Sequence, residues 1–451
     1  MQIYDKLKAK FRRLSGLWRQ EKTLKKRFLN IGHLLTGNFL GSLIGLVAFA
    51  LTARALGPAE YGLLALCFSY TRAVERIISF QSWQPLIKYA AGLKGVEGEA
   101  DLKSLLKFGL CLDVLAAFVS WVIAIGLTLI AAPILKIDES TVVLVLAYCS
   151  VLLFHISGMP TAVLRLYGHF RLIAYGQLAT SLFRLVLCGI GVAKGGGLFD
   201  FAMIWIVTQI FSSIFFVVIA FRTLHAHGIN RVLRAPLSAI SNRFPGIWGF
   251  AWSANLSLTI RSTAFEGDTL LVGLLADPAS AGLYHIAKRV GRTIQQVGVQ
   301  VQTVIYPDVA RLWANGAYGE FKRAIIQVEA ALLGFGISML IFFYFTIETI
   351  LLLTAGPAFL AAAPLVIVQT IAGGITLSGS ALRSSLLAMG LQHKLLMIVI
   401  VATAAFHITA LLLIPRIGAM GANIAHIVLA IVLGGGMLSV FQKGFAQRPK
   451  P

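Results

Sequence analysis

Long apolar segments follow one another along most of the chain, separated by short polar or charged connections. About twelve of them reach the roughly 20 residues that a helix needs to cross a bilayer. They are expected near residues 31–53, 61–87, 104–132, 141–164, 172–193 and 198–221, and again near 247–275, 280–306, 323–347, 362–388, 395–414 and 418–441. Because lipid cannot hydrogen-bond the backbone, the pattern predicts an all-α polytopic membrane protein.

The predicted helix between Gly282 and Gln300 is polar along one side although its neighbours are apolar. At 100° per residue, one face collects His285, Lys288, Arg289, Arg292, Gln296 and Gln300. An ionisable side chain at membrane depth costs several kcal/mol unless it faces water, protein or ligand. We therefore predict that this face lines an aqueous cavity. The alternative is an interfacial helix whose cations extend to the headgroups.

Three charged segments flank these spans and divide the chain. Residues 1–30 carry ten Lys and Arg residues, and Tyr4, Leu7, Phe11, Leu14 and Trp18 recur on one helical face. We interpret them as a basic amphipathic helix on the anionic cytoplasmic leaflet; the alternative is a disordered tail that only sets topology. Residues 222–246 are interpreted as a cytoplasmic linker helix broken at Pro236, between an N-lobe (31–221) and a C-lobe (247–441). Residues 442–451 form a cytoplasmic tail.

Composition and charge agree with a membrane location. The chain is 58% hydrophobic and only 13% charged, whereas soluble domains are about a quarter charged. The net charge of +21 is attributed to the positive-inside rule and to anionic headgroups, not to a nucleic-acid partner. The predicted cytoplasmic segments hold 28 Lys and Arg residues, against four (Arg54, Lys136, Lys194 and Arg416) on the opposite side. This bias predicts that both termini lie in the cytoplasm.

The two halves repeat weakly at an offset of 220 residues. Pro58 corresponds to Pro278, Gly62 to Gly282, and Arg72 to Arg292. Each half contains six spans, an even number, so the second half enters the membrane in the same orientation as the first. The repeat therefore predicts two parallel six-helix lobes, related by an axis along the membrane normal, around a central cationic cavity with the substrate site between them.

Most of the cations within the predicted spans fall in spans two, seven and eight, together with three carboxylates. The candidate substrate-binding residues are Arg72, Arg76, Arg261, Lys288, Arg289 and Arg292, and the carboxylates are Glu75, Glu266 and Asp268. Guanidinium groups pair bidentately with phosphate oxygens, so the cluster suits an anion such as a pyrophosphate. Three carboxylates cannot neutralise six cations. The alternative is that the charges only pair with one another and hold the halves together.

Four short motifs are spread along the chain: RALGPAEYG (54–62), TAVLR (161–165), DTLLVG (268–273) and GAMGAN (418–423). Together they resemble the motifs of Wzx-type polysaccharide flippases, in the multidrug/oligosaccharidyl-lipid/polysaccharide exporter superfamily. The resemblance implies alternating access in the bacterial inner membrane and an undecaprenyl-pyrophosphate-linked oligosaccharide as cargo, for O-antigen, lipopolysaccharide or exopolysaccharide synthesis. It also implies partners among membrane lipids and polysaccharide polymerase and chain-length proteins.

Two other functions compete with this interpretation. A drug/cation antiporter of the same superfamily would need an acidic cavity, whereas this cluster is net basic. A membrane-embedded glycan polymerase or ligase would need a large outer loop with catalytic groups, whereas the predicted outer connections are short. We predict no catalytic residue, cofactor or metal site. Glu75, Glu266 and Asp268 are candidates for ion coupling; for Asp268, an ion pair with Arg261 or Arg289 is the alternative.

Overall fold

The computed structural model describes residues 2–79, 82–90, 93, 95–238, 240–249, 259 and 262–447. Within these ranges the chain is almost entirely helical and contains no strand, which confirms the predicted all-α class. Nine of the described helical segments are long and apolar enough to cross a membrane. Large apolar side chains such as Phe345 (76% exposed) and Ile134 (71% exposed) point outward, as expected where lipid replaces water as the solvent.

The N-lobe is built from the first half of the chain. Its helices are α1 (Gln2–Ile78), α2 (Trp83–Ala90), α3 (Gly95–Leu135), α4 (Glu139–Leu153), α5 (Gly158–Leu166), α6 (Phe170–Ala193) and α7 (Leu198–Ala226). The long helix α1 contains two spans, because Gly57 takes a φ of 74° and turns the chain before Pro58. Only glycine adopts such a φ without steric cost.

The C-lobe follows a connecting region that contains η1 (Val232–Arg234) and α8 (Ile240–Arg243). Its helices are α10 (Asp268–Leu275), α11 (Pro278–Ala314), α12 (Tyr318–Thr354), η2 (Pro357–Ala362), α13 (Ala363–Ser378), α14 (Ser380–Ala388), α15 (Gln392–Ile417) and α16 (Ala419–Ala446). Asp277 caps α11 by accepting hydrogen bonds from the backbone N–H and the hydroxyl of Ser280 at 2.8 and 2.6 Å. These bonds hold the pKa of the Asp277 carboxyl below its ordinary value.

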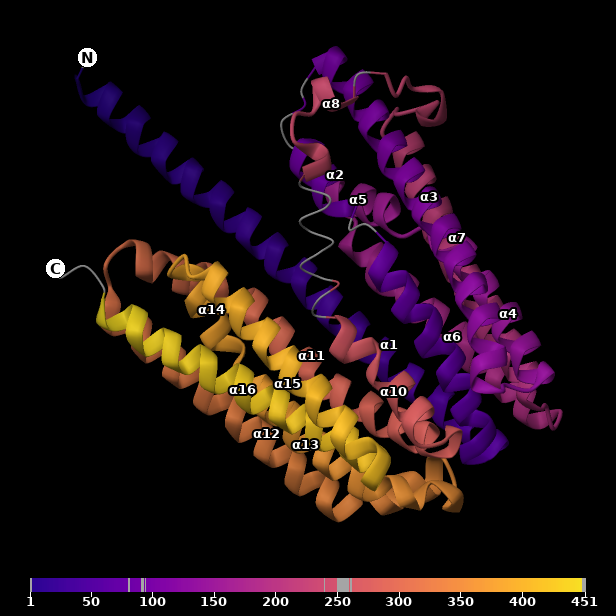
Figure 1. Ribbon diagram of the computed structural model, residues 1–451. Coiled ribbons are helices and arrows are strands. Elements are labelled where there is room, and N and C mark those ends of the chain that lie inside the picture. The colour runs from indigo at the N-terminus through magenta and orange to yellow at the C-terminus, as the bar shows by residue number, and fades with distance from the viewer. Residues whose placement is uncertain are drawn as a thin grey trace.

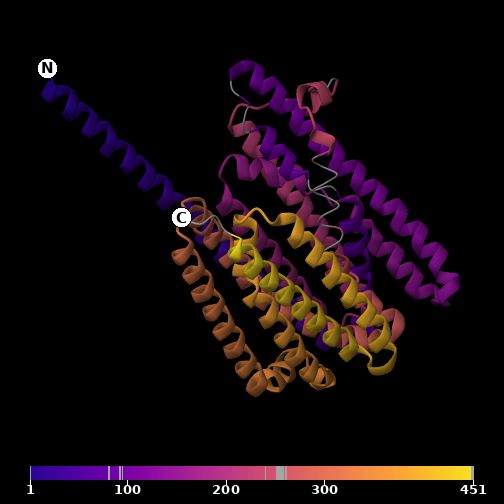
Figure 2. The same cartoon turned by 60° about the vertical axis from the view of Figure 1, so that its left-hand side comes forward.

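The two lobes meet along α1 and α11 (Figures 1 and 2). In Figure 1 they converge at the lower right and diverge toward the end that carries α8 and the C-terminus. At the converging end the backbones of the two lobes touch. A Cβ atom on Gly62 would lie 1.7 Å from the carbonyl oxygen of Pro278, and one on Gly282 would lie 2.5 Å from that of Pro58. The contact is reciprocal between residues related by the offset of 220, so it confirms the predicted parallel duplication.

We expect the double variant Gly62→Ala/Gly282→Ala to hold the lobes apart at this end, because each new methyl group would overlap a backbone carbonyl that cannot move aside like a flexible side chain. The measurement is maleimide labelling of Ala281→Cys in detergent-solubilised protein. Ala281 is fully buried beside the contact. The parent should carry Cys111→Ser, because Cys111 is exposed.

The matched control for this experiment is Gly334→Ala, since a Cβ at Gly334 meets nothing within 4 Å. Ala281→Cys should stay unreactive in the parent and in the control, and should react at least about tenfold faster in the double glycine variant. Unchanged reactivity in the double variant would contradict this account of the contact.

Short helices α5 and α14 occupy equivalent places in the two lobes, and each is capped by a carboxylate from another helix. Asp113 of α3 accepts hydrogen bonds from the Ser82 hydroxyl at 2.5 Å and from the backbone N–H of Met159 at 2.8 Å. Glu329 of α12 accepts one from the backbone N–H of Leu382 at 2.8 Å. Each carboxylate satisfies an N–H that a helix start leaves unpaired.

Several predicted spans are interrupted in the structure. The span predicted at 61–87 ends at Ile78, and α2 is a separate helix. The span predicted at 141–164 divides into α4 and α5, where Pro160 lacks an N–H and would clash with the preceding turn of a continuous helix. The span predicted at 362–388 divides at Gly379, and that at 247–275 contains a break at Gly267. These breaks create the helix ends on which the site is built.

The two basic segments also differ from expectation. Residues 2–30 are helical, but they continue without interruption into the first span; their placement on the leaflet stays a prediction. The segment 222–246 is not one linker helix. Helix α7 extends to Ala226 and ends before Gly228, whose φ is 77°; in the described residues of the segment, η1 and α8 follow. Among the apolar residues of this segment, Phe244 is buried, whereas Leu233 is exposed.

Candidate functional site: a cationic cavity between the lobes

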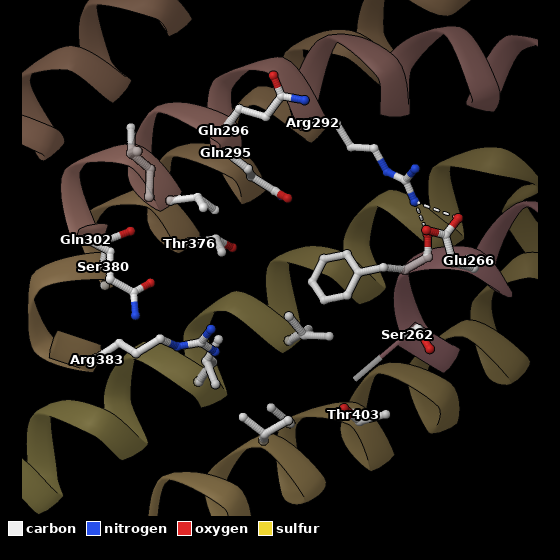
Figure 3. Close-up of a pocket in the computed structure, with 18 of the residues that line it drawn as sticks. Ser262, Glu266, Arg292, Gln295, Gln296, Gln302, Thr376, Ser380, Arg383 and Thr403 are labelled. Atoms are coloured by element: carbon white, nitrogen blue, oxygen red, sulfur yellow. Dashed lines mark hydrogen bonds and ion pairs between the residues drawn. The ribbon is translucent and has the colours of Figure 1, made fainter. Parts of the chain in front are cut away.

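A cavity of about 540 Å³ lies between the lobes and extends into the C-lobe (Figure 3). Arg72 and Arg76 of α1 line it from the N-lobe, and Arg292 of α11 lines it from the C-lobe. Its size is within the range of pockets that hold a small ligand. Glu266 is the sole carboxylate among the lining residues of the described chain. The cavity is therefore net positive.

Arg72 and Arg292 are held at the cavity by ion pairs. Arg72 Nη1 lies 3.2 Å from Glu75 Oε2, and Arg292 Nη2 lies 3.0 Å from Glu266 Oε2. The other oxygen of Glu75 lies 3.0 Å from His155 Nε2. Within the described residues, Arg76 has no carboxylate at ion-pair distance, and the buried Nε of Arg72 has no hydrogen-bond partner. Donors thus remain for a ligand.

The break at Gly267 positions Arg292. In a regular helix the N–H of Thr269 would bind the carbonyl of Phe265. Here that N–H donates to Asp268 Oδ1 at 2.7 Å, and the Phe265 carbonyl accepts from Arg292 Nη2. One guanidinium therefore holds both a carboxylate and a freed carbonyl, which fixes its direction toward the cavity.

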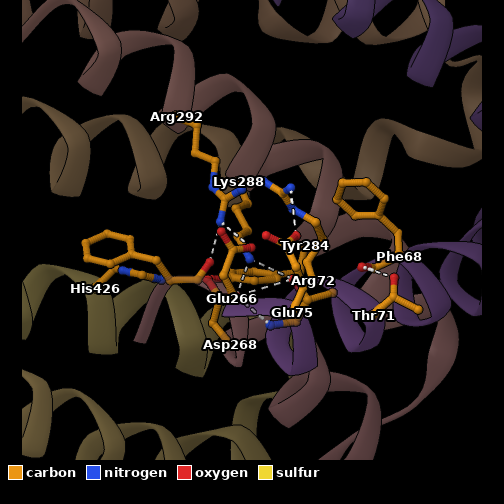
Figure 4. Close-up of polar contacts among 12 residues, drawn as sticks. Phe68, Thr71, Arg72, Glu75, Glu266, Asp268, Tyr284, Lys288, Arg292 and His426 are labelled. Atoms are coloured by element: carbon orange, nitrogen blue, oxygen red, sulfur yellow. Dashed lines mark hydrogen bonds and ion pairs between the residues drawn. The ribbon is translucent and has the colours of Figure 1, made fainter. Parts of the chain in front are cut away.

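Asp268 is fully buried, and hydrogen-bond donors surround its carboxylate (Figure 4). Its Oδ1 accepts from Lys288 Nζ, and its Oδ2 lies 2.7 Å from the Tyr284 hydroxyl and 2.9 Å from His426 Nε2. Lys288 also donates to the Thr269 hydroxyl at 3.1 Å. The cluster ties α10, α11 and α16 together, and it leaves the carboxylate few free acceptor positions.

Arg289 lies against aromatic rings that come mainly from the N-lobe. Its guanidinium carbon is 3.4 Å from the ring centre of Phe49 and 5.4 Å from that of Phe68. Nδ1 of the neighbouring His285 lies 2.8 Å from the Tyr61 hydroxyl. A desolvated cation–π contact contributes about 2 kcal/mol. Arg289 therefore joins the lobes at the converging side of the cavity and does not line the cavity wall.

The structure thus separates the cations that the sequence grouped. Arg72, Arg76 and Arg292 line one cavity. Lys288 and Arg289 do not line it: Lys288 pairs with Asp268, and Arg289 stacks on the aromatic rings. Arg261 lies outside the described residues. The partner of Asp268 is Lys288 together with His426, and not Arg289.

Sequence reasoning missed two kinds of residue in the site. His426 and Tyr284 complete the Asp268 cluster, and Arg383 of α14 lines the cavity. Arg383 belongs to the polar stretch SGSALRSS (378–385), which interrupts an otherwise apolar run. That interruption was the available signal. His426 offered none, because a single histidine within an apolar run is usually a packed core residue.

Two lobes of long apolar helices around a cationic cavity define a multi-pass membrane protein. The chain belongs to the polysaccharide biosynthesis protein family, whose model matches residues 29–313. It is 25% identical over 324 residues to the inner membrane protein YghQ of Escherichia coli (strain K12), across 72% of this chain and 90% of that protein.

Solved structures show the same fold. The lipid II flippase MurJ in an inward closed conformation superposes with a TM-score of 0.68 at 14% identity, covering 92% of this chain and 89% of that one. An inward-facing multidrug resistance MATE family transporter superposes with a TM-score of 0.66 at 12% identity, covering 93% and 96%. The chain thus has the two-lobe fold of these membrane proteins, and its family agrees with the resemblance that the sequence motifs indicated.

Proposed function

We propose that this protein flips a lipid-pyrophosphate-linked oligosaccharide across the bacterial inner membrane by alternating access, for lipopolysaccharide or other polysaccharide synthesis. The observation that carries the proposal is that Arg72, Arg76 and Arg292 come from both lobes and line one cavity with a single carboxylate, Glu266. Arginines that converge from two sides suit a diphosphate, which has two groups of oxygens to bind.

The shape of the protein supports a transport cycle. The lobes touch through Gly62 and Gly282 at one end and diverge at the other, so the cavity has one closed side. A ligand that contacts arginines of both lobes favours an arrangement in which the lobes lie close together around it. Its binding energy can therefore shift the equilibrium toward a state in which the lobes meet at the end where they now diverge. We infer that Arg72 and Arg292, at equivalent positions of the two lobes, are the paired anchors for the pyrophosphate. Polysaccharide polymerase and chain-length proteins are the partners that this pathway would supply.

The direct test is binding of farnesyl pyrophosphate to the purified protein in detergent. This probe carries the pyrophosphate and a short isoprenoid but no sugar. We expect it to bind at least about tenfold more tightly than farnesyl monophosphate, since only the diphosphate reaches the arginines of both lobes. Farnesol is the control for the lipid part. Equal affinity for the three compounds would rule out a pyrophosphate site.

A drug/cation antiporter is the second candidate, and the likeness to a MATE family transporter favours it. The lining of the cavity opposes it, because four arginines and one carboxylate repel a cation. The two functions are separated by repeating the binding measurement with ethidium, a cationic drug. Saturable ethidium binding that farnesyl pyrophosphate does not displace would favour the antiporter.

Both termini are proposed to be cytoplasmic, from the excess of cations on that side. In a Cys111→Ser parent, Gly197→Cys, at the start of α7, should react with an impermeant maleimide on intact cells. Asn230→Cys, on the connecting region, should react only after permeabilisation. Both positions are exposed, and a Cβ at Gly197 meets nothing within 4 Å. The reverse pattern would invert the topology.

A further inference from the structure

We propose that the cavity has a second anion-binding end, formed by Gln302, Ser380 and Arg383, which selects glycans that carry an anionic substituent. This inference rests on the proposed function and specifies its cargo. Figure 3 shows Arg383 across the cavity from Arg292 and Glu266. The cavity therefore offers a guanidinium at each of two separate ends.

The polar face of α11 that connects these ends is longer than a pyrophosphate. Arg292, Gln295, Gln296 and Gln302 all line the cavity from this helix. At 1.5 Å per residue, the ten residues from Arg292 to Gln302 span roughly 15 Å. A pyrophosphate held at Arg292 covers only a fraction of this distance. The remainder is lined by amide side chains, which donate to and accept from sugar hydroxyls.

Helices α15 and α16 line the cavity mainly with apolar side chains. These are Val399, Ala402, Leu429, Leu433 and Met437, beside one hydroxyl group from Thr403. An apolar wall lowers the local polarisability, so that a charged contact on the facing side is stronger than it would be in water. Arg383 is half-buried, and it is the cation nearest in sequence to the start of α14.

The start of α14 does not itself supply the anion site, because Glu329 already caps it through the N–H of Leu382. At this end of the cavity the guanidinium of Arg383, the hydroxyl of Ser380 and the amide of Gln302 are among the lining groups. A planar guanidinium beside neutral donors fits a carboxylate or a phosphate better than a plain hydroxyl. The shared chemistry is an anionic group, carried either by a uronic acid or by a phosphorylated sugar.

Four probes test this inference on the purified full-length protein. They are farnesyl pyrophosphate and three conjugates in which its diphosphate is linked to glucose, to glucuronic acid or to glucose 6-phosphate. The last three differ only at carbon 6 of the sugar. We expect at least one anionic conjugate to bind about tenfold more tightly than the glucose conjugate, because it gains one charge-assisted contact. A gain for glucuronic acid alone identifies a uronic acid, and a gain for the 6-phosphate alone identifies a phosphorylated sugar.

The substitution Arg383→Gln should remove this preference and leave the affinity for farnesyl pyrophosphate within about twofold, because the anchors at the other end are untouched. Arg383→Lys should retain part of the preference, since it keeps the charge but loses the planar fork. Arg323→Gln, on an exposed position of α12, is the matched control and should change nothing.

The proposal is overturned if the three conjugates bind equally, or if Arg383→Gln leaves the preference intact while farnesyl pyrophosphate still binds. In both cases the proposed function stands and only the second end is lost. If farnesyl pyrophosphate binds no better than farnesol, the proposed function and this inference fail together.

Discussion

Replacing Arg72 and Arg292 by glutamine, in a protein that also carries Glu75→Gln and Glu266→Gln, is expected to reduce transport at least about a hundredfold. Each arginine contributes a charge-assisted contact worth about 1.5–3 kcal/mol to a bound phosphate, and two such contacts give this factor. The carboxylates are changed as well because each arginine is ion-paired, and its loss alone would strand a buried charge.

The measurement is surface polysaccharide in a cell that lacks its own flippase for the same glycan, beside the amount of each variant in the membrane. Glu75→Gln/Glu266→Gln without the arginine changes is the matched control, and it should retain most of the transport because the cationic groups remain. Full polysaccharide from the quadruple variant at normal membrane levels would exclude Arg72 and Arg292 as anchors. Loss of all the variants from the membrane would instead assign these pairs to folding.

Asp268→Asn is expected to destabilise the C-lobe by about 3–5 kcal/mol, because it leaves the ammonium of the buried Lys288 without a charged partner. Asp268→Asn/Lys288→Met should recover much of this loss, since it removes both charges. The measurement is the thermal midpoint of the purified protein in detergent. Equal midpoints for Asp268→Asn and the parent would contradict the ion pair.

The same variants test the prediction that Asp268 couples ion movement to the switch between the lobes. Asp268 accepts from Lys288, Tyr284 and His426 together. A coupling role requires that one of these contacts changes with the ion or the proton that drives transport. If the double variant Asp268→Asn/Lys288→Met transports with an unchanged dependence on pH and sodium, Asp268 has a structural role alone.

The fold could be predicted from the sequence because its determinants are local or repeated. Apolar segments of membrane-spanning length are visible without tertiary information, and the offset that relates Pro58 and Gly62 to Pro278 and Gly282 is visible in two short stretches. The cationic face of α11 was equally accessible, since residues three and four apart share a face. Arg292 on α11, and Arg72 and Arg76 on the second span, are therefore predictable from the sequence alone.

The partners of these residues could not be predicted, because they depend on contacts between distant segments. Asp268 and His426 are 158 residues apart, and the periodicity of either segment says nothing about their distance in space. Glu329 caps α14 from 53 residues away, and this contact made a break at Gly379 tolerable within an apolar run. Sequence patterns locate a charged face. Which charges on it neutralise each other is decided by packing.

The reciprocal contact of Gly62 with Pro278 and of Gly282 with Pro58 has the form of an isologous interface. In such an interface one surface patch meets its own copy across a two-fold axis, and every contact occurs twice. Two identical six-helix proteins inserted in the same orientation could form this contact as a homodimer. The packing of the lobes is thus compatible with an ancestor that was a dimer before its genes were fused, and fusion freed each copy to diverge. Positions 72 and 292 both carry arginine, whereas Lys288 and Arg383 correspond to Phe68 and Val163 in the first half.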